Sequence, residues 1–276
     1  MSSVLRVFPS PAIDRHALAK IEGVVHASRL GVRPQPRTIP TAIASVDELT
    51  GGAPRGGLTE ICGPASSGRT SLLLALLAQA TAREEVCAVV DASDAFDPYF
   101  AAAAGVDLKR LLWVRCGEVS RFKFHVSRDS ERRETRNVKR ETFAQVEQAL
   151  RALDLLLQAG GFGLLAMDLG DIPPAIVRRI PLTSWFRFRR AVENTATTLV
   201  VVEQEASAKS CASLVLKTRH LVISSEHLVK TGTSPTHARL LSGLQLEVEV
   251  LNARILQRKP PRSAMATFES RAPWVG

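Results

Sequence analysis

Short apolar runs alternate with longer segments of helical periodicity through most of the chain. Six runs of this kind predict β-strands, at residues 58–63, 86–91, 111–115, 161–168, 197–204 and 212–218. Between them, residues 69–83 are apolar on almost every side and predict a buried helix. Residues 142–159 carry one apolar stripe and predict an amphipathic helix, and a shorter helix that ends at glycine is expected at residues 95–105. Such alternation predicts an α/β fold, a mostly parallel twisted sheet with helices on both faces.

Three segments depart from this pattern. Residues 244–250 alternate strictly between apolar residues and Gln or Glu, which predicts a half-buried antiparallel strand at one edge of the sheet. Residues 118–141 mix basic and acidic residues with little apolar periodicity, which favours a charged insertion in the core. Residues 258–276 have no periodicity, so a loose tail is expected there.

The first 38 residues are expected to form an arm ahead of a core at residues 39–257. Within the arm, Leu18, Ile21 and Val25 have the spacing of one helix face. The residues that follow this helix contain two prolines and two arginines, which predicts a linker.

The composition excludes a wholly disordered chain and favours a polyanionic partner. Of the 276 residues, 45% are apolar and 23% charged, which suffices for a large core. Lys and Arg number 36 against 27 Asp and Glu, so the net charge is +9. The four cysteines form no CxxC pair, which is typical of a reducing cytosol. Since neither a secretory signal nor a run long enough for a membrane span is visible, we expect a soluble cytoplasmic protein without membrane contact.

A glycine-rich segment between the first predicted strand and the buried helix is the most specific motif. It consists of Gly63, Pro64, Ala65, Ser66, Ser67, Gly68, Arg69 and Thr70, followed by Ser71. In a P-loop, backbone N–H groups at a helix N-terminus bind phosphates and the Thr hydroxyl binds Mg²⁺, so the segment predicts a site for ATP and magnesium. The alternative is a glycine-rich turn that only caps a core helix.

Two positions modify this prediction. Residue 69 is Arg where the motif has Lys, and a planar guanidinium is harder to place against the β- and γ-phosphates, so efficient hydrolysis is not expected. Asp168 ends a predicted strand and is expected to be the second magnesium ligand, although aspartates at strand ends are also common for structural reasons.

Residues 41–80 and 87–112 resemble the core of the RecA family of P-loop ATPases. The resemblance rests on the P-loop, on the AFDP sequence at residues 95–98 and on a glycine-rich lead-in. The lead-in glycines are Gly51, Gly52, Gly56 and Gly57. Residues 105–115 and 242–254 are similar to the ImuA-like branch, accessory proteins of bacterial translesion synthesis. The resemblance covers about residues 39–255 and implies a RecA-like fold.

The resemblance also implies roles for individual residues. The nucleotide and magnesium positions of the family are matched by Gly63, Gly68, Thr70 and Asp168. Gln204 matches a glutamine that senses nucleotide and relays the signal to DNA. Ser93 stands where the family has the glutamate that activates water, with Asp94 beside it, which implies weak ATPase activity or none. The loop after Gln204 ends near Cys211, so the DNA-binding loop of recombinases is largely missing and strand exchange is not expected.

Arginines interleave with aromatic residues after Asp168, as in many single-strand nucleic-acid sites. The arginines are Arg178, Arg179, Arg187, Arg189 and Arg190, and the aromatic residues are Trp185, Phe186 and Phe188. The alternative is an amphipathic helix that buries Trp185, Phe188 and Val192; we favour it for the aromatic residues, and both interpretations stay open for the arginines. Arg132 and Arg133, in the charged insertion, are a weaker candidate for DNA contact.

The resemblance implies a bacterial, cytoplasmic, nucleoid-associated accessory protein of the SOS response and DNA repair. Its expected role is to bind single-stranded DNA or a RecA-type recombinase, and to help load an ImuB-like subunit and a polymerase for translesion synthesis. The helix in the arm would pack on its own core or serve self-association. A DNA-stimulated recombinase-type ATPase, and an inhibitor or scaffold that needs no nucleotide, are the alternatives.

Overall fold

The computed structural model describes residues 37–116, 131–221, 243–253 and 265–271. All of them lie in one compact unit that spans residues 36–276. The predicted arm therefore falls almost wholly outside the described residues, as does most of the charged insertion.

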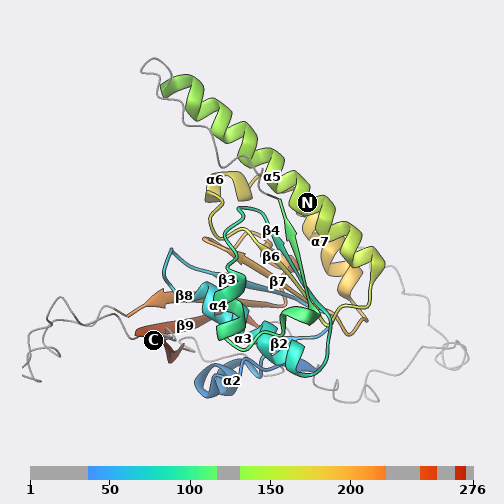
Figure 1. Ribbon diagram of the computed structural model, residues 1–276, viewed down its shortest axis with the longest axis vertical. Coiled ribbons are helices and arrows are strands. Elements are labelled where there is room, and N and C mark those ends of the chain that lie inside the picture. Colours follow the sequence, from blue (N-terminus) through green and yellow to red (C-terminus); the bar gives the residue numbers. More distant parts are fainter. Residues whose placement is uncertain (1–36, 117–130, 222–242, 254–264, 272–276) are drawn as a thin grey trace, which may run out of the picture. The chain divides into compact units, whose positions relative to one another are not determined.

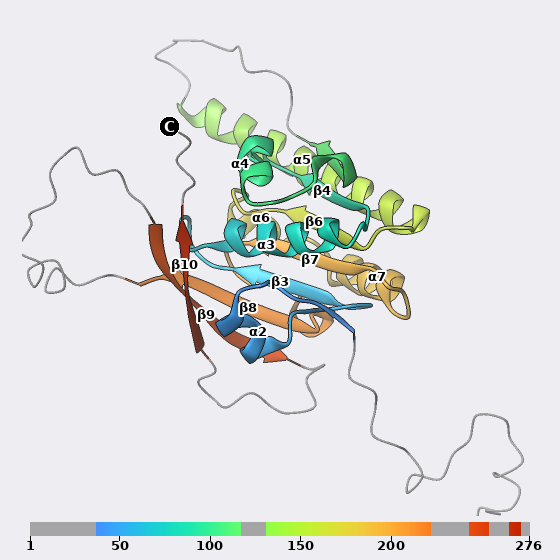
Figure 2. The ribbon, with the colours of Figure 1, turned by 60° about the horizontal axis from the view of Figure 1, so that its bottom comes forward.

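The core is an eight-stranded sheet in which six neighbouring strands run parallel. The strands are β3 (Leu58–Cys62), β4 (Cys87–Asp91), β5 (Leu111–Arg115), β6 (Leu164–Asp168), β7 (Thr198–Glu203), β8 (Leu214–His220), β9 (Gly243–Ala253) and β10 (Met265–Arg271). Their order across the sheet is β10-β9-β8-β3-β7-β6-β4-β5, and only β9 and β10 join their neighbours antiparallel. Figure 2 shows β9 and β10 side by side at one end of the sheet. Two short strands, β1 (Thr38–Ile39) and β2 (Ala53–Pro54), pair separately.

Helices cover both faces of the sheet, as the alternating sequence pattern predicts. They are α2 (Ala44–Thr50), α3 (Arg69–Ala82), α4 (Pro98–Ala103), α5 (Glu131–Ala159), α6 (Pro174–Val177) and α7 (Leu182–Val192), with 3₁₀ turns η2 (Leu108–Arg110) and η3 (Lys209–Cys211). One hydrophobic core joins α2, α3 and α4 to the sheet, and a second joins α5, α6 and α7 to the opposite face. In Figure 1, α3 and α4 lie in front of the sheet, whereas α5 and α7 lie along its other side.

The strand sequences explain why both faces are covered. In β6, Leu164 and Ala166 contribute to the first core and Leu165 and Met167 to the second, and β7 alternates in the same way. Because successive side chains of a strand point to opposite faces, a continuous apolar run is stable only when each face is buried.

The predicted antiparallel strand near the sheet edge is confirmed. β9 pairs antiparallel with β8 on one side and with β10 on the other. Leu246 and Val248 are fully buried, whereas Gln245 and Glu249 are more exposed. Glu247, between the two buried residues, is 7% exposed and pairs with Arg219.

Two expectations are wrong in part. The tail was expected to be loose, but residues 265–271 form β10, whose pattern is weak because its inward residues include the small Ala266. Its stability comes from pairing with β9, a non-local contact that periodicity does not reveal. Likewise, α5 begins at Glu131, inside the predicted charged insertion. Because Arg, Lys and Glu favour helix, the helix that packs at residues 142–159 can extend toward its N-terminus without an apolar stripe.

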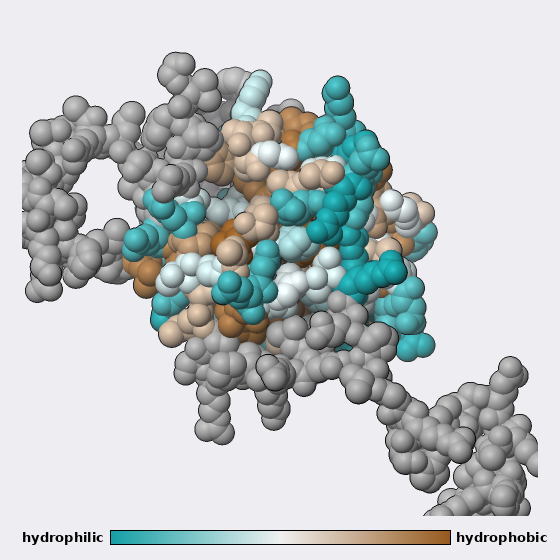
Figure 3. Space-filling view, turned by 90° about the horizontal axis from the view of Figure 1, so that it is seen from below, coloured by the Kyte–Doolittle hydropathy of each residue, from teal (hydrophilic) through white to brown (hydrophobic). Residues whose placement is uncertain are grey.

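The surface seen from below Figure 1 mixes both kinds of residue. In Figure 3, apolar patches are interrupted by hydrophilic residues, which form a band along one side of that face. Among the described residues, no helix combines the length and the apolar character that a membrane crossing requires.

The aromatic residues of α7 give a direct test of the second core. Trp185 is 1% exposed and Phe186, its neighbour, is 47% exposed. Trp185→Ala should lower the free energy of unfolding by about 3–5 kcal/mol, the usual cost of removing a large aromatic side chain from a core. Phe186→Ala should change it by less than about 0.5 kcal/mol. Urea denaturation followed by circular dichroism measures both, and equal effects would contradict this orientation of α7.

Candidate nucleotide site

The glycine-rich segment has the geometry of a phosphate-binding loop. It follows β3 directly, and Gly68, with φ at +90°, is the residue from which α3 begins. Since φ values near +90° are strained for residues with a side chain, a glycine is required there. The first N–H groups of α3 lack partners within the helix, and its N-terminus carries partial positive charge, so the loop can accept a phosphate.

Packing against β8, β9 and β10 holds the flank of the loop. A Cβ atom on Gly63 would lie 2.3 Å from the carbonyl oxygen of Thr218, and one on Gly68 would lie 2.5 Å from Cδ1 of Leu246. The Ser67 hydroxyl is 2.7 Å from the Thr218 hydroxyl, and Ser71 Oγ is 3.0 Å from Ser270 Oγ. Ser67 and Ser71, both predicted nucleotide contacts, therefore bond to the sheet.

The other predicted loop residues remain accessible. Pro64, Ala65, Ser66 and Thr70 are exposed. The Thr70 hydroxyl lies in the first turn of α3, where the motif places its magnesium ligand.

Arg69 is turned away from the exposed part of the loop. Its side chain is buried, with only 7% of the residue exposed, and Nη1 donates to the carbonyl oxygen of Gly170 at 3.0 Å. Nε2 of Gln204 donates to the same oxygen at 3.1 Å and to the Ile172 oxygen at 3.3 Å. The structure thus joins the substituted P-loop residue and the predicted sensor glutamine through the loop after β6.

Asp168 ends β6 at the same edge of the sheet. Burial, together with the negative charges of Asp91 and Asp171, raises the pKa of Asp168 to about 6. The N–H of Gly170 and the positive charge of Arg69 lower this pKa and offset part of the rise. The Gly170 N–H donates to Oδ1 at 2.8 Å. A buried carboxylate with one backbone donor is stabilised by a cation, and the exposed Thr70 hydroxyl would be the second oxygen ligand that the motif implies. The residues present therefore fit magnesium and a nucleotide.

The groups needed to activate water do not fit as well. The Ser93 hydroxyl is buried without a hydrogen-bond partner among the described residues. Asp94 forms a bidentate ion pair with Arg115, with both N–O distances at 2.6 Å. Asp91, which the sequence analysis did not single out, accepts the N–H groups of Ser93, Ala95 and Phe96 and holds the turn. Because the Asp94 carboxylate is held in the ion pair with Arg115, it is poorly placed to act as a base.

A buried pair of glutamates lies beside this site and escaped the sequence analysis. Glu60 on β3 and Glu203 on β7 are both 0% exposed. Ser207 N–H donates to Glu60 at 2.8 Å and to Glu203 at 3.0 Å, and Ala208 N–H donates to Glu60 at 2.6 Å. Burial, with the adjacent Glu60 carboxylate, raises the pKa of Glu203 to about 10. The pair therefore holds a proton at neutral pH and fixes the short loop after β7; a charged residue inside an apolar run was the only signal for it.

Most of the candidate DNA-binding arginines have partners within the chain. Arg178 pairs with Glu205 and Arg187 with Asp154, Arg179 lies over the Phe143 ring, and Arg189 donates to the Ser210 carbonyl. Arg190 is exposed, and within the described part of the chain its side chain has no partner. It lines a cavity of about 560 Å³ with Phe186, one turn away. Arg132 and Arg133 lie on α5, but their side chains fall outside the description.

Comparisons with known proteins agree with this geometry. Residues 19–119 match the RecA N-terminal domain family, which begins within the arm expected from the sequence. The chain is 29% identical over 227 residues to Protein RecA of Mesorhizobium japonicum, covering 72% of this chain and 55% of that protein. It is 30% identical over 209 residues to Protein RecA of Mycolicibacterium gilvum, covering 68% and 52%. Over 77 residues, 27% of this chain and 21% of the relative, identity to Protein RecA of Brucella anthropi reaches 47%.

A P-loop α/β protein is the class that the sheet and the loop define. Within this class, the chain belongs to the RecA family, as the sequence resemblance implied. It spans about half the length of the curated relatives that it matches.

The glutamate pair predicts an unusual dependence of stability on pH. The pKa of Glu203 is raised from its ordinary value of 4.5 to about 10 in the folded chain. Between these two values the folded chain binds more protons than the unfolded chain, so stability falls as pH rises through this range. Glu203→Gln should remove much of that slope and raise the melting temperature above pH 8. Glu205→Gln, at an exposed position on the same loop, should leave the slope unchanged. Thermal denaturation between pH 5 and pH 9 measures it, and identical slopes in all three proteins would contradict the shared proton.

Proposed function

We propose that this chain is a RecA-like accessory protein of DNA damage tolerance, which binds Mg-ATP as a structural or regulatory ligand and hydrolyses it poorly. The hydrogen bond from Arg69 to the Gly170 carbonyl is the observation that carries the proposal. The side chain at the position that should stabilise charge on the phosphates instead binds another part of the protein. The buried Ser93 hydroxyl and the Asp94–Arg115 ion pair support it independently.

The roles of the individual residues follow from their positions. The backbone N–H groups of residues 64–70 would hold the phosphates, and Thr70 and Asp168 would hold magnesium. Magnesium would neutralise phosphate charge and the Asp168 carboxylate together. Gln204 and Arg69 both donate to Gly170 O, two residues beyond Asp168, so occupancy of the site can reach the loop after β6.

The partners that we propose follow from the family and the charge. Single-stranded DNA, a RecA-type recombinase and ImuB-like or polymerase subunits are the candidates for an ImuA-like protein in translesion synthesis. A net charge of +9 favours a polyanion among them. Self-association through the arm and a nucleoid-associated cytoplasmic location belong to the same proposal.

A DNA-stimulated ATPase of the recombinase type is the second candidate. The contact of Gln204 with the loop after Asp168 favours it, since this contact joins the predicted sensor to the predicted metal site. A scaffold or inhibitor that needs no nucleotide is the third, favoured by the bonds that Ser67 and Ser71 make to the sheet.

Nucleotide binding and turnover separate these candidates. Mg-ATP titrated by calorimetry should bind the native chain, and Thr70→Ala should weaken binding by roughly tenfold or more, because a metal ligand is lost. Thr183→Ala, which removes an exposed hydroxyl from α7, should bind as the native chain does. Turnover should stay at background with and without single-stranded DNA.

Each contrary result identifies another function. Turnover that single-stranded DNA stimulates would replace the accessory role with the recombinase-type ATPase. No binding at millimolar nucleotide would leave the nucleotide-independent scaffold.

Binding of single-stranded DNA should depend more on Arg190 than on nearby arginines that form ion pairs within the chain, such as Arg178. Arg190→Ala should weaken binding of a fluorescent oligothymidylate and reduce the slope of log K against log salt by about 0.7, the value for one phosphate contact on a single strand. Arg178→Ala, which breaks the ion pair with Glu205, should have a smaller effect. Fluorescence anisotropy over a salt series measures both, and equal slopes in the three proteins would exclude this face of α7 from DNA contact.

A further inference from the structure

A cavity of about 1220 Å³ opens at the edge of the sheet opposite the P-loop. Its lining includes residues that precede β4, β6 and β7, whereas the P-loop follows β3. Because these strands are parallel, their starts and their ends lie at opposite edges, and the cavity is separate from the nucleotide site.

Two of the residues that line the cavity, Arg55 and Glu85, form an ion pair. Arg55 donates to Glu85 through Nη1 at 2.8 Å and Nη2 at 2.6 Å, and Nη1 also donates to the carbonyl oxygens of Gly163 and Ala196. A Cβ atom on Gly163 would lie 2.0 Å from Glu85 Oε2, so the chain leaves room for this pair by having a glycine. The guanidinium of Arg55 is therefore paired within the protein, with Glu85 and two backbone carbonyl oxygens.

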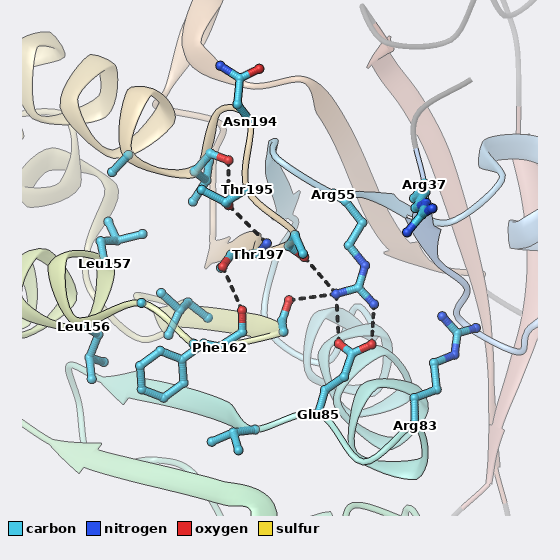
Figure 4. Close-up of a pocket in the computed structure, with 18 of the residues that line it drawn as sticks. Arg37, Arg55, Arg83, Glu85, Leu156, Leu157, Phe162, Asn194, Thr195 and Thr197 are labelled. Atoms are coloured by element: carbon cyan, nitrogen blue, oxygen red, sulfur yellow. Dashed lines mark hydrogen bonds and ion pairs between the residues drawn. The ribbon is translucent and has the colours of Figure 1, made fainter. Parts of the chain in front are cut away.

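Two further arginines on the rim are not used in this way. Arg37 and Arg83 are exposed, and within the described residues their guanidinium groups make no hydrogen bond or ion pair. Figure 4 shows both on one side of the cavity, with Leu156 and Leu157 on the other side and Phe162 near them. The cavity is therefore basic along one wall and apolar along the other.

Three helices end at this cavity. α3 ends at Ala82, α5 at Ala159 and α7 at Val192, each within a few residues of the lining. The carbonyl ends of helices carry partial negative charge and accept N–H donors. Together with Glu84, which also lines the cavity, they disfavour a row of phosphates and favour a ligand that combines N–H groups with few negative charges.

We propose that the cavity binds a short linear segment of a partner protein in which an acidic residue adjoins leucine, isoleucine or phenylalanine. The acidic side chain pairs with Arg37 and Arg83, since guanidinium and carboxylate form two parallel hydrogen bonds. The apolar side chain packs on Leu156, Leu157 and Phe162, and backbone N–H groups meet the helix ends. Residues 1–36 of this chain are a poor occupant, because they carry more basic than acidic residues. The inference does not depend on the nucleotide site.

Selection from a phage-displayed library of random linear peptides on the full chain tests the proposal. Enriched peptides should contain Asp or Glu next to a large apolar residue. A synthetic peptide of the enriched sequence, followed by fluorescence anisotropy, should bind the Arg37→Glu, Arg83→Glu double variant at least roughly tenfold more weakly, from the loss of charged hydrogen bonds.

The matched control is Lys209→Glu with Lys217→Glu. This variant has the same change of charge at two exposed positions outside the cavity and should bind the peptide as the native chain does. Because all four positions are exposed, circular dichroism should show native folding in both variants. Thr70→Ala should bind the peptide normally, so that failure of the nucleotide proposal stays distinguishable from failure of this one.

Five outcomes would overturn the proposal. Three are the absence of enrichment, enrichment of basic sequences, and equal binding by the native chain and the arginine variant. The fourth, displacement of the peptide by oligothymidylate, would assign the cavity to nucleic acid. The fifth, displacement by a synthetic peptide of residues 1–36, would show that the chain's own N-terminal segment is the occupant.

Discussion

Burial of the parallel strands on both faces is the constraint on which the other features of the structure depend. β3 lies between β7 and β8, and its side chains alternate between two separate cores. Six strands that run in one direction bring their carboxyl ends to one edge of the sheet. Gly63 after β3, Asp168 at the end of β6 and Gln204 after β7 meet there for that reason, although more than a hundred residues separate the first from the others.

At this edge, polar groups that leave water must find partners inside the protein. Arg69 and Gln204 share the Gly170 carbonyl, and Glu60 and Glu203 share the N–H of Ser207. Bonds of this kind fix the loops after β6 and β7 in place. They also place Arg69, at the lysine position of the P-loop motif, in a buried hydrogen bond to the loop after β6.

The opposite edge of the sheet is organised by different interactions. There the Arg55–Glu85 ion pair joins the turn before β3 to the segment before β4, and its bonds to Gly163 and Ala196 reach the segments before β6 and β7. Among the described residues, the side chains that form these hydrogen bonds at one edge are not those that form them at the other. The two edges can in this way present two separate binding regions.

The sequence by itself determined the class of the fold, the P-loop and the parallel strands, because apolar periodicity and a glycine-rich turn are local properties of the chain. It also determined that Trp185 and Phe188 are buried, since their spacing matches one helix face. Tertiary structure alone decided that Arg69 donates to Gly170, that Glu60 meets Glu203, and that β10 pairs with β9. Each of these contacts joins residues distant along the chain, and no local pattern encodes which of several polar partners a buried side chain will reach.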